Sequence, residues 1–275
     1  MVIKMIYIII SHDVDHLFSR DHWFRDLVYP KMWIRTSIQL VKREIKLSEW
    51  FLRNISCFRK NRHNLEAQMQ FDEQYGVKPT YFFGMNQGLG MSYKPHEAKQ
   101  MISRVYENGF DVGVHGIDYQ SMEGIKDEYD RFLSVMGFLP CGIRMHYVRF
   151  NDKTFKMLNE IGYRFDCTEF DKKNCGTIKN PYKVGKMWEF PLTIMDGYLP
   201  QEFEKAKQKT LDILTLCKEQ NIEYISVLFH DYQFCKDYND IWRWYKWLIE
   251  FFANSKEYEF VSYMEAIRRL EEKND

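Results

Sequence analysis

Short, almost continuously apolar runs alternate with longer segments of helical spacing along most of this chain, and this alternation restricts its fold more than any other feature. Runs at 5–11, 80–83, 111–115 and 224–229 have the composition of strands that are buried on both faces. Such strands, separated by helices, are typical of a parallel α/β sheet. Further strands are predicted at 142–145, 164–167, 188–192 and 260–262. Helices are predicted at 95–108, 123–136, 151–161, 202–220, 241–253 and 263–273.

The length of 275 residues is about that of one (β/α) barrel, so we predict a single domain spanning residues 1–275. With 45% hydrophobic and 17% aromatic residues, the chain can fill a large core. Residues 17–62 are too long for an ordinary connection between a strand and a helix. Within them, apolar residues recur at helical spacing, namely Ile34, Ile38, Val41 and Ile45. We therefore predict a helical insertion in the barrel, and an extra helix packed on the barrel wall is its simplest interpretation.

Cysteine usage and the start of the chain indicate a cytoplasmic protein. The six cysteines are scattered and form no C-x-x-C pair, which favours reduced thiols over a disulfide framework. The apolar run from Met5 to Ile10 leads directly into His12 and Asp13 without a small-residue cleavage site, so we interpret it as a buried strand. No window approaches the ~20 apolar residues of a membrane span.

Charge is balanced over the whole chain but not within the insertion. The 39 basic and 39 acidic residues give no support for binding a polyanion, and we expect no nucleic-acid partner. Residues 31–53, however, combine the apolar stripe with interfacial aromatic residues, a pattern typical of helices that rest on anionic membranes. The alternative is that the stripe packs against the barrel and leaves the cations in water. The residues concerned are Lys31, Arg35, Lys42, Arg43, Lys46 and Arg53, with Trp33, Trp50 and Phe51.

Four of the predicted strands end in polar side chains that can carry metal-dependent chemistry. In (β/α) barrels the carboxyl ends of the strands and the loops that follow build the site. A zinc-like ion needs carboxylate and imidazole ligands and an open position, while a second carboxylate and an acid are needed for proton transfer. Asp13 and Asp15 point to the same side of an extended chain, so both can reach the rim. The strand ends read Ser11-His12-Asp13-Val14-Asp15-His16, His115-Gly116-Ile117-Asp118, Arg144-Met145-His146-Tyr147-Val148-Arg149 and His230-Asp231.

These motifs resemble those of the polysaccharide deacetylase family, also called the NodB-homology or carbohydrate esterase 4 group. The resemblance covers residues 5 to about 262 apart from the insertion, and this chain looks like a divergent cytoplasmic branch. It implies a distorted (β/α)7-type barrel, one divalent metal ion, and removal of acetyl groups from glycans. Asp13 and Asp15 match the first motif, in which one Asp is the base and the other binds metal.

The second family motif normally supplies two metal-binding histidines, but only the first is present here. His115 matches it, whereas Tyr119 stands where the second histidine is expected. The third ligand is then either Asp118, one position earlier, or His146 from the neighbouring strand end. A carboxylate in place of an imidazole is acceptable to zinc and moves the preference slightly towards harder ions.

The remaining motifs imply the groups that assist the reaction. By resemblance, Arg144 orients Asp13, and the backbone N–H of Tyr147 helps to bind an oxyanion. His230, in Leu228-Phe229-His230, would be the general acid, with Asp231 as a possible orienting group. The fourth motif supplies an Asp that tunes this histidine, and either Asp166 or Asp171 fits it loosely.

Other residues have less specific interpretations. His12 and His16 flank the two aspartates and are expected to pack or cap more often than to touch metal. Arg149 is a further candidate for substrate binding, and Glu189 is either a substrate contact or a partly exposed strand residue. A stripe of aromatic residues at 242–247 is expected to belong to the core rather than to form a platform for sugars.

The sequence therefore predicts a zinc-dependent hydrolase that removes an acetyl group, N-acetyl rather than O-acetyl, from a carbohydrate or a glycan precursor. Two alternatives from other classes remain. A barrel with an impaired metal site would bind glycan without catalysis, and the Tyr119 position is its main support. A metal-dependent phosphoesterase would usually hold more metal ligands. Composition and motifs leave the oligomeric state open.

Overall fold

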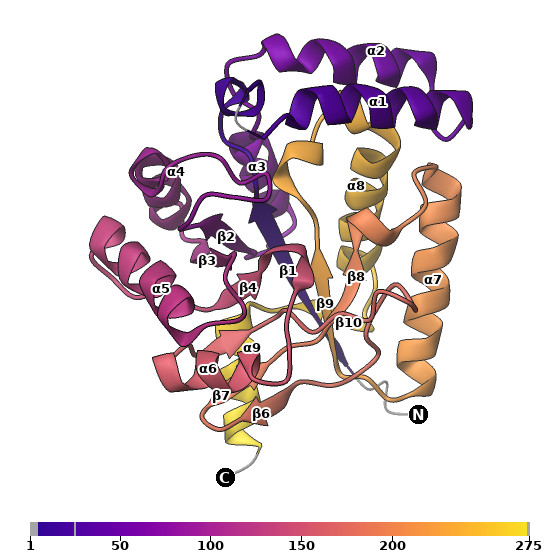
Figure 1. The fold of residues 1–275 in the computed structure, drawn as a ribbon. Coiled ribbons are helices and arrows are strands. Elements are labelled where there is room, and N and C mark those ends of the chain that lie inside the picture. Colours follow the sequence, from indigo (N-terminus) through magenta and orange to yellow (C-terminus); the bar gives the residue numbers. More distant parts are fainter. Residues whose placement is uncertain (1–4, 25, 274–275) are drawn as a thin grey trace.

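A computed structural model describes residues 5–24 and 26–273 (Figure 1). Its strands are β1 (Ile6–Val14), β2 (Thr80–Gly84), β3 (Asp111–Gly116), β4 (Ile143–Met145), β5 (Phe165–Asp166), β6 (Tyr182–Val184), β7 (Met187–Glu189), β8 (Leu192–Met195), β9 (Tyr224–Leu228) and β10 (Tyr258–Phe260). Its α-helices are α1 (Val28–Val41), α2 (Leu47–Ile55), α3 (Leu65–Gln74), α4 (Pro95–Glu107), α5 (Met122–Met136), α6 (Thr154–Ile161), α7 (Phe203–Glu219), α8 (Asn239–Ala253) and α9 (Tyr263–Glu272).

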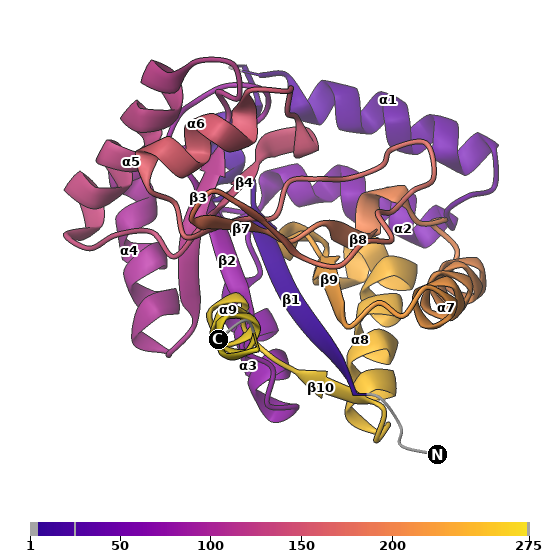
Figure 2. The ribbon, with the colours of Figure 1, turned by 90° about the horizontal axis from the view of Figure 1, so that it is seen from below.

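The strands form one curled sheet in the order β6-β7-β5-β4-β3-β2-β1-β9-β8, with β10 paired to the beginning of β1. Every pairing is parallel except that of β6 with β7. Helices cover the outside of the curled sheet (Figures 1 and 2). This is the strand-and-helix barrel architecture that the alternating sequence pattern predicted, so that prediction is confirmed.

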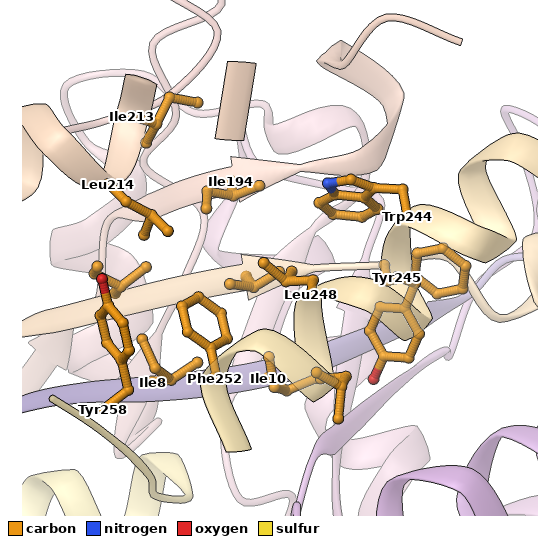
Figure 3. Packing of buried hydrophobic residues seen from close by; sticks show 14 of the residues in the cluster. Ile8, Ile10, Ile194, Ile213, Leu214, Trp244, Tyr245, Leu248, Phe252 and Tyr258 are labelled. Atoms are coloured by element: carbon orange, nitrogen blue, oxygen red, sulfur yellow. The ribbon is translucent and has the colours of Figure 1, made fainter. Parts of the chain in front are cut away.

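The long strand β1 is central because its apolar residues pack on both faces of the sheet. Ile8 and Ile10 pack with residues of α7 and α8, among them Trp244 (Figure 3). Ile9 faces the other side, where it packs with Phe82 and with residues of α9. Burial on both faces explains why this strand reads as a continuous apolar run.

The aromatic residues of α8 contribute to this core. Trp244 and Tyr245 are fully buried, and Trp242 and Trp247 pack partly buried against the same cluster. The expectation of a core stripe is therefore confirmed, and these side chains offer no exposed platform to a sugar.

Two strand predictions differ from the structure. The run at 188–192 was expected to be one strand, but it divides into the end of β7 and the start of β8, with Phe190 and Pro191 between them. Pro191 has no backbone N–H to contribute to a ladder, which explains the break. The antiparallel partner β6 was not predicted, because its residues are only partly buried and lack an apolar run.

The segment between β1 and α3 contains the hairpin of α1 and α2, which lies beyond the carboxyl end of β1 (Figure 1). Its apolar stripe does not pack on the barrel wall as the simplest interpretation expected. Ile34, Ile38 and Val41 are exposed, and only Ile45 of the stripe is buried. Arg53, expected among the surface cations, is instead buried against the carbonyl of Asp237. No helix in the described ranges is long and apolar enough to cross a membrane.

Candidate metal centre

The ends of three strands bring Asp15, His115 and His146 together. Asp15 directly follows β1, His115 lies in β3, and His146 follows β4. One potential ligand atom from each residue lies within 4.8 Å of those of the other two, and all three residues are buried. Because β4, β3, β2 and β1 are neighbours in the sheet, their carboxyl ends converge on this point. Of the two candidates for a third ligand, His146 lies in the group. We call Asp15, His115 and His146 the metal-binding group of the candidate site.

Each imidazole is oriented by a backbone carbonyl on its outer side. Nδ1 of His115 lies 3.0 Å from the carbonyl oxygen of Arg144, and Nε2 of His146 lies 3.1 Å from that of Leu89. A carbonyl oxygen only accepts, so these outer nitrogens carry the protons. When both rings are neutral, the inner nitrogens, His115 Nε2 and His146 Nδ1, present lone pairs to each other across 2.9 Å.

The carboxylate of Asp15 completes a group of acceptors that lacks a donor. Its Oδ1 lies 3.2 Å from His115 Nε2 and 3.5 Å from His146 Nδ1, and it is buried without a hydrogen-bond partner. Three acceptor atoms that face one another can share a cation. A divalent ion fits this donor set, because two imidazoles and one carboxylate with outer carbonyl partners are a common set in open zinc sites.

The protonation states also suit a cation site. Burial lowers the pKa of His146 to about 4, so its imidazole is neutral near pH 7. Burial opposes ionisation of Asp15, but the interactions with His146, His115 and His230 outweigh it and hold the pKa of Asp15 well below its usual range. Burial lowers the pKa of His115, but Asp13 and Asp15 outweigh it and raise that pKa, so a metal ion would have to displace a proton from His115.

Asp13 lies beside this group and is held by a buried arginine. Nη1 of Arg144 donates to Asp13 Oδ1 at 2.9 Å, while Nη2 donates to the hydroxyl of Ser11 and Nε to the carbonyl of Cys167. The other carboxylate oxygen, Oδ2, lies 3.6 Å from His115 Nε2. Burial opposes ionisation of Asp13, but His115 and Arg144 outweigh it and lower its pKa. Asp13 is thus an oriented carboxylate with one oxygen free to face the centre.

His230 lies against Asp15 and is held by a carboxylate that the sequence reasoning missed. Its Nδ1 lies 2.7 Å from Asp196 Oδ1, and its backbone N–H donates to Asp196 Oδ2. Its Nε2 lies 3.7 Å from Asp15 Oδ2. Burial would lower the pKa of His230, but Asp196 outweighs it and, with Asp15 and Asp13, raises that pKa to about 10. Asp196 directly follows β8. An aspartate at a strand end could have indicated its role, but β8 was not predicted as a separate strand.

Several candidates lie outside this constellation. Asp118 is not among the group; its Oδ1 accepts from the backbone N–H groups of Gln120 and Ser121 before α5. Asp231 does not orient His230: it is buried elsewhere and accepts from the backbone N–H of Asn64.

Neither candidate for the fourth motif contacts His230 through a hydrogen bond. Asp171 is a partly exposed turn residue that accepts from the backbone N–H groups of Lys173 and Asn174. Asp166 is fully buried beside Glu189, and burial raises the pKa of both carboxyls, that of Asp166 to about 6. Glu189 was expected to be either a substrate contact or a partly exposed strand residue. In the structure it is instead a buried neighbour of Asp166.

The remaining histidines and aromatics of the motifs have structural partners. His12 is fully buried, with Nδ1 near the carbonyl of Phe229 and Nε2 near Asp72. The ring of His16 contacts that of His22, with centroids 4.4 Å apart. Tyr119 lies under the guanidinium of Arg149, which also donates to the carbonyl of Ile117. In the structure neither His12 nor His16 belongs to the metal-binding group.

Tyr147 lines a cleft and directly follows His146 in the chain. It adopts a left-handed backbone conformation with φ of 58°, which is unusual for an aromatic residue and common at functional turns. Its hydroxyl donates to the carbonyl of Leu89, the same oxygen that holds His146. The cleft has a volume of about 670 Å³ and lies between this turn, residues 87–92 and the start of α1 up to Lys31.

Comparisons with known proteins identify the fold. No family model and no curated protein matches the chain. Among solved structures, it is similar to a protein from Mycobacterium smegmatis assigned to the polysaccharide deacetylases, with a TM-score of 0.64, 15% identity, and coverage of 99% of this chain and 92% of that one. A PuuE allantoinase matches with a TM-score of 0.66, 13% identity and coverage of 97% and 90%.

A third similar structure is the peptidoglycan deacetylase PdaC from Bacillus subtilis, with a TM-score of 0.51, 11% identity and coverage of 100% and 96%. Identities this low establish a shared fold and leave the activity to the site itself. This chain therefore has the fold of the polysaccharide deacetylases, the family that its motifs resemble.

Proposed function

We propose that this protein is a zinc-dependent carbohydrate deacetylase that hydrolyses an N-acetyl group. One observation carries the proposal: a carboxylate and an imidazole flank the metal-binding group, each oriented by a buried partner of opposite charge. Asp13 is held by Arg144 at 2.9 Å, and His230 is held by Asp196 at 2.7 Å. A hydrolase of this kind needs one base and one acid on either side of the reacting carbonyl.

The site residues divide the reaction between them. Asp15, His115 and His146 would hold the ion, which supplies Lewis-acid chemistry by polarising the acyl carbonyl and acidifying the attacking water. Asp13 accepts the proton of that water while Arg144 keeps its carboxylate in place. The backbone N–H of Tyr147 would stabilise the developing oxyanion.

His230 then donates a proton to the leaving amine. Asp196 favours the imidazolium form, and a pKa of about 10 keeps His230 protonated at neutral pH. Amines are poor leaving groups until they are protonated, so this side chain decides whether the carbon–nitrogen bond breaks. The complementary pair, an ionised Asp13 and a charged His230, is the acid–base arrangement that amide hydrolysis requires.

The proposed substrate is a glycan precursor inside the cell rather than an exported wall polymer. The open cleft of about 670 Å³ beside Tyr147 has room for a sugar of limited size. Lys31 lines this cleft beside Asp26 and offers a cation to a precursor that carries a phosphate.

Acetate release from a panel of N-acetylated and O-acetylated sugars, with and without a chelator, tests the proposal. We expect release that the chelator abolishes and that zinc restores. Asp13→Asn and His230→Ala should each lower turnover by about 10²–10⁴ with zinc affinity nearly unchanged. Normal turnover in either variant would contradict its assigned role, and loss of zinc from Asp13→Asn would make that residue a ligand.

The two alternatives make different predictions in the same experiment. An impaired glycan-binding barrel would release no acetate from any sugar. Its support was the missing second histidine of the motif, but His146 offers a second imidazole from another strand end. A phosphoesterase would release phosphate and bind about two ions per chain, whereas the described residues contain one group of three ligands.

A further inference from the structure

The hairpin of α1 and α2 presents apolar side chains to solvent. On α1, Ile34, Ile38 and Val41 are 64%, 50% and 82% exposed. Successive helical residues are about 100° apart, so these three lie on the side opposite the buried ones. The buried residues of α1 are Tyr29, Met32, Thr36 and Gln39. The helix therefore buries Tyr29 and Met32 together with the polar Thr36 and Gln39, and directs its branched apolar residues outward.

The second helix, α2, also exposes apolar side chains, and it buries charged ones. Leu47, Phe51 and Ile55 are 66%, 56% and 39% exposed, whereas Glu49 and Arg53 are buried. Arg53 donates to the carbonyl of Asp237 at 2.7 Å, so α2 is attached to the barrel through a polar contact. Monomeric proteins rarely expose contiguous apolar patches without a binding role.

The two apolar stripes share one surface. Nε1 of Trp33 donates to the carbonyl of Asn54, and Nε1 of Trp50 donates to the hydroxyl of Ser37, so the helices lie side by side. In Figure 1 the pair lies along one outer edge of the molecule. We call the surface formed by the six exposed apolar residues the outer face; its members are Ile34, Ile38, Val41, Leu47, Phe51 and Ile55.

Unpaired cations surround the outer face. Lys31, Arg35, Lys42, Arg43 and Lys46 are exposed, and within the described chain none of them forms an ion pair with a carboxylate. Lys31, Arg35 and Lys42 line a groove of about 460 Å³ together with Ile34, Ile38, Gln39 and one carboxylate, Glu44. Apolar residues beside an excess of cations match a surface of acyl chains below anionic headgroups.

The same helix connects the outer face to the candidate metal centre. Lys31 lines both the groove along α1 and the cleft that reaches Tyr147. Tyr147 directly follows His146 and shares with it the carbonyl of Leu89. A substrate that extends from the surface under the outer face would therefore enter the cleft at Lys31 and reach Tyr147, which is adjacent in the chain to His146.

We propose that the outer face docks on an anionic lipid bilayer, and that the deacetylase substrate is a sugar attached to a lipid through phosphate. The identity of the substrate rests on the proposed function, whereas the docking does not. A second copy of the chain is a poorer occupant, because a twofold contact would bring the same five cations against each other. A bilayer rich in anionic lipid instead neutralises them.

Vesicle flotation tests the docking with the whole protein. We expect it to float with phosphatidylcholine vesicles that contain phosphatidylglycerol at low salt, and not with pure phosphatidylcholine vesicles. High salt should release it, because salt screens the attraction between the basic side chains and the anionic headgroups. Arg35→Glu/Lys42→Glu and Ile38→Ser/Phe51→Ser should each lower the bound fraction at least about tenfold.

Matched variants away from the outer face serve as controls. Leu139→Ser/Leu216→Ser removes two apolar residues that are 59% and 45% exposed, and Lys156→Glu/Lys205→Glu reverses two exposed cations. Both should float as the wild type does. No flotation of the wild type with anionic vesicles at low salt would overturn the docking, as would equal loss in the controls.

Two further measurements separate the remaining outcomes. A dimer in sedimentation that Ile38→Ser/Phe51→Ser dissociates would assign the outer face to a second copy and overturn the proposal. Acetate release from a soluble acetylated sugar should be the same in the wild type and the outer-face variants. If the protein floats but releases no acetate from any sugar, the proposed function fails while the docking stands.

Discussion

At the scale of single residues, the candidate metal centre depends on which nitrogen of each histidine carries a proton. The carbonyls of Arg144 and Leu89 fix the outer protons of His115 and His146, and the inner nitrogens then turn their lone pairs toward Asp15. These backbone partners are the outer contacts that commonly orient metal-binding histidines. His146 therefore offers, from the next strand end, the second imidazole that Tyr119 cannot supply.

His146→Ala should lower the affinity for zinc by more than about 100-fold, since loss of even an outer contact of a ligand costs about 10–100-fold. Competition with a chromophoric chelator measures this affinity. Asp118→Ala is the matched control, because Asp118 was the alternative ligand and its carboxylate faces Gln120 and Ser121. Unchanged zinc affinity in His146→Ala, or a comparable loss in Asp118→Ala, would contradict the assignment of His146.

Asp196→Asn should lower turnover by about 10²–10⁴, because His230 loses the carboxylate that stabilises its imidazolium form. The pKa of His230 is raised to about 10 mainly by Asp196. The alkaline limb of the pH profile should therefore move to lower pH in the variant. The pH profile of kcat distinguishes this effect from a general loss of structure. Asp171→Asn, at the exposed turn that the fourth motif had suggested, should retain the wild-type profile.

At the scale of elements, the loop from β3 to α5 is held by a buried carboxylate on α5. Glu128 is fully buried, and its carboxylate accepts from the backbone N–H groups of Ile117 and Asp118, which follow His115. Burial is the largest influence on Glu128 and raises its pKa from 4.5 to about 7. The position of the strand end that carries His115 is therefore coupled to the ionisation of a neighbouring helix residue.

Glu128 should make the free energy of unfolding depend on pH. Its folded pKa lies above its unfolded pKa, so its contribution to stability is present below about pH 4.5 and is lost as pH rises to about 7. The loss amounts to at most about 3.5 kcal/mol, because each pKa unit corresponds to about 1.4 kcal/mol. Since glutamine does not titrate, the stability of Glu128→Gln relative to the wild type should increase over that range.

Urea denaturation of chelator-treated protein between pH 4.5 and pH 8 measures this difference. Glu123→Gln provides the control, since Glu123 lies exposed in the first turn of the same helix. A difference between Glu128→Gln and the wild type that stays constant with pH would show that Glu128 has an ordinary pKa.

At the scale of the whole molecule, two different features lie side by side at the carboxyl edge of the curled sheet. Buried charged groups from β1, β3, β4, β8 and β9 converge at the candidate metal centre. Beside it, the hairpin of α1 and α2 carries exposed apolar residues and cations (Figure 1). The parallel sheet explains the convergence, because all its strands that carry site residues end at the same edge.

The sequence alone determined the architecture, and it predicted where a hydrolytic site would lie. Continuous apolar runs identified the buried parallel strands, because burial on both faces leaves no polar positions in a strand. The positions of Asp13, Asp15, His115 and His230 at strand ends indicated a hydrolytic metal site before any contact was known. These features are local in the chain, and local patterns are what a sequence displays.

Only the tertiary structure decided which residues meet. Asp196 and His230 lie 34 positions apart, and their pairing at 2.7 Å depends on β8 and β9 being neighbours in the sheet. The choice of His146 over Asp118 depends on which side chain reaches Asp15 from an adjacent strand end. The apolar stripe of α1 shows the same dependence: its periodicity predicted a helix with one apolar side, but in the structure the opposite side, with Thr36 and Gln39, is buried and the apolar side faces solvent. Periodicity defines a face of a helix, and only packing against the rest of the chain decides where that face points.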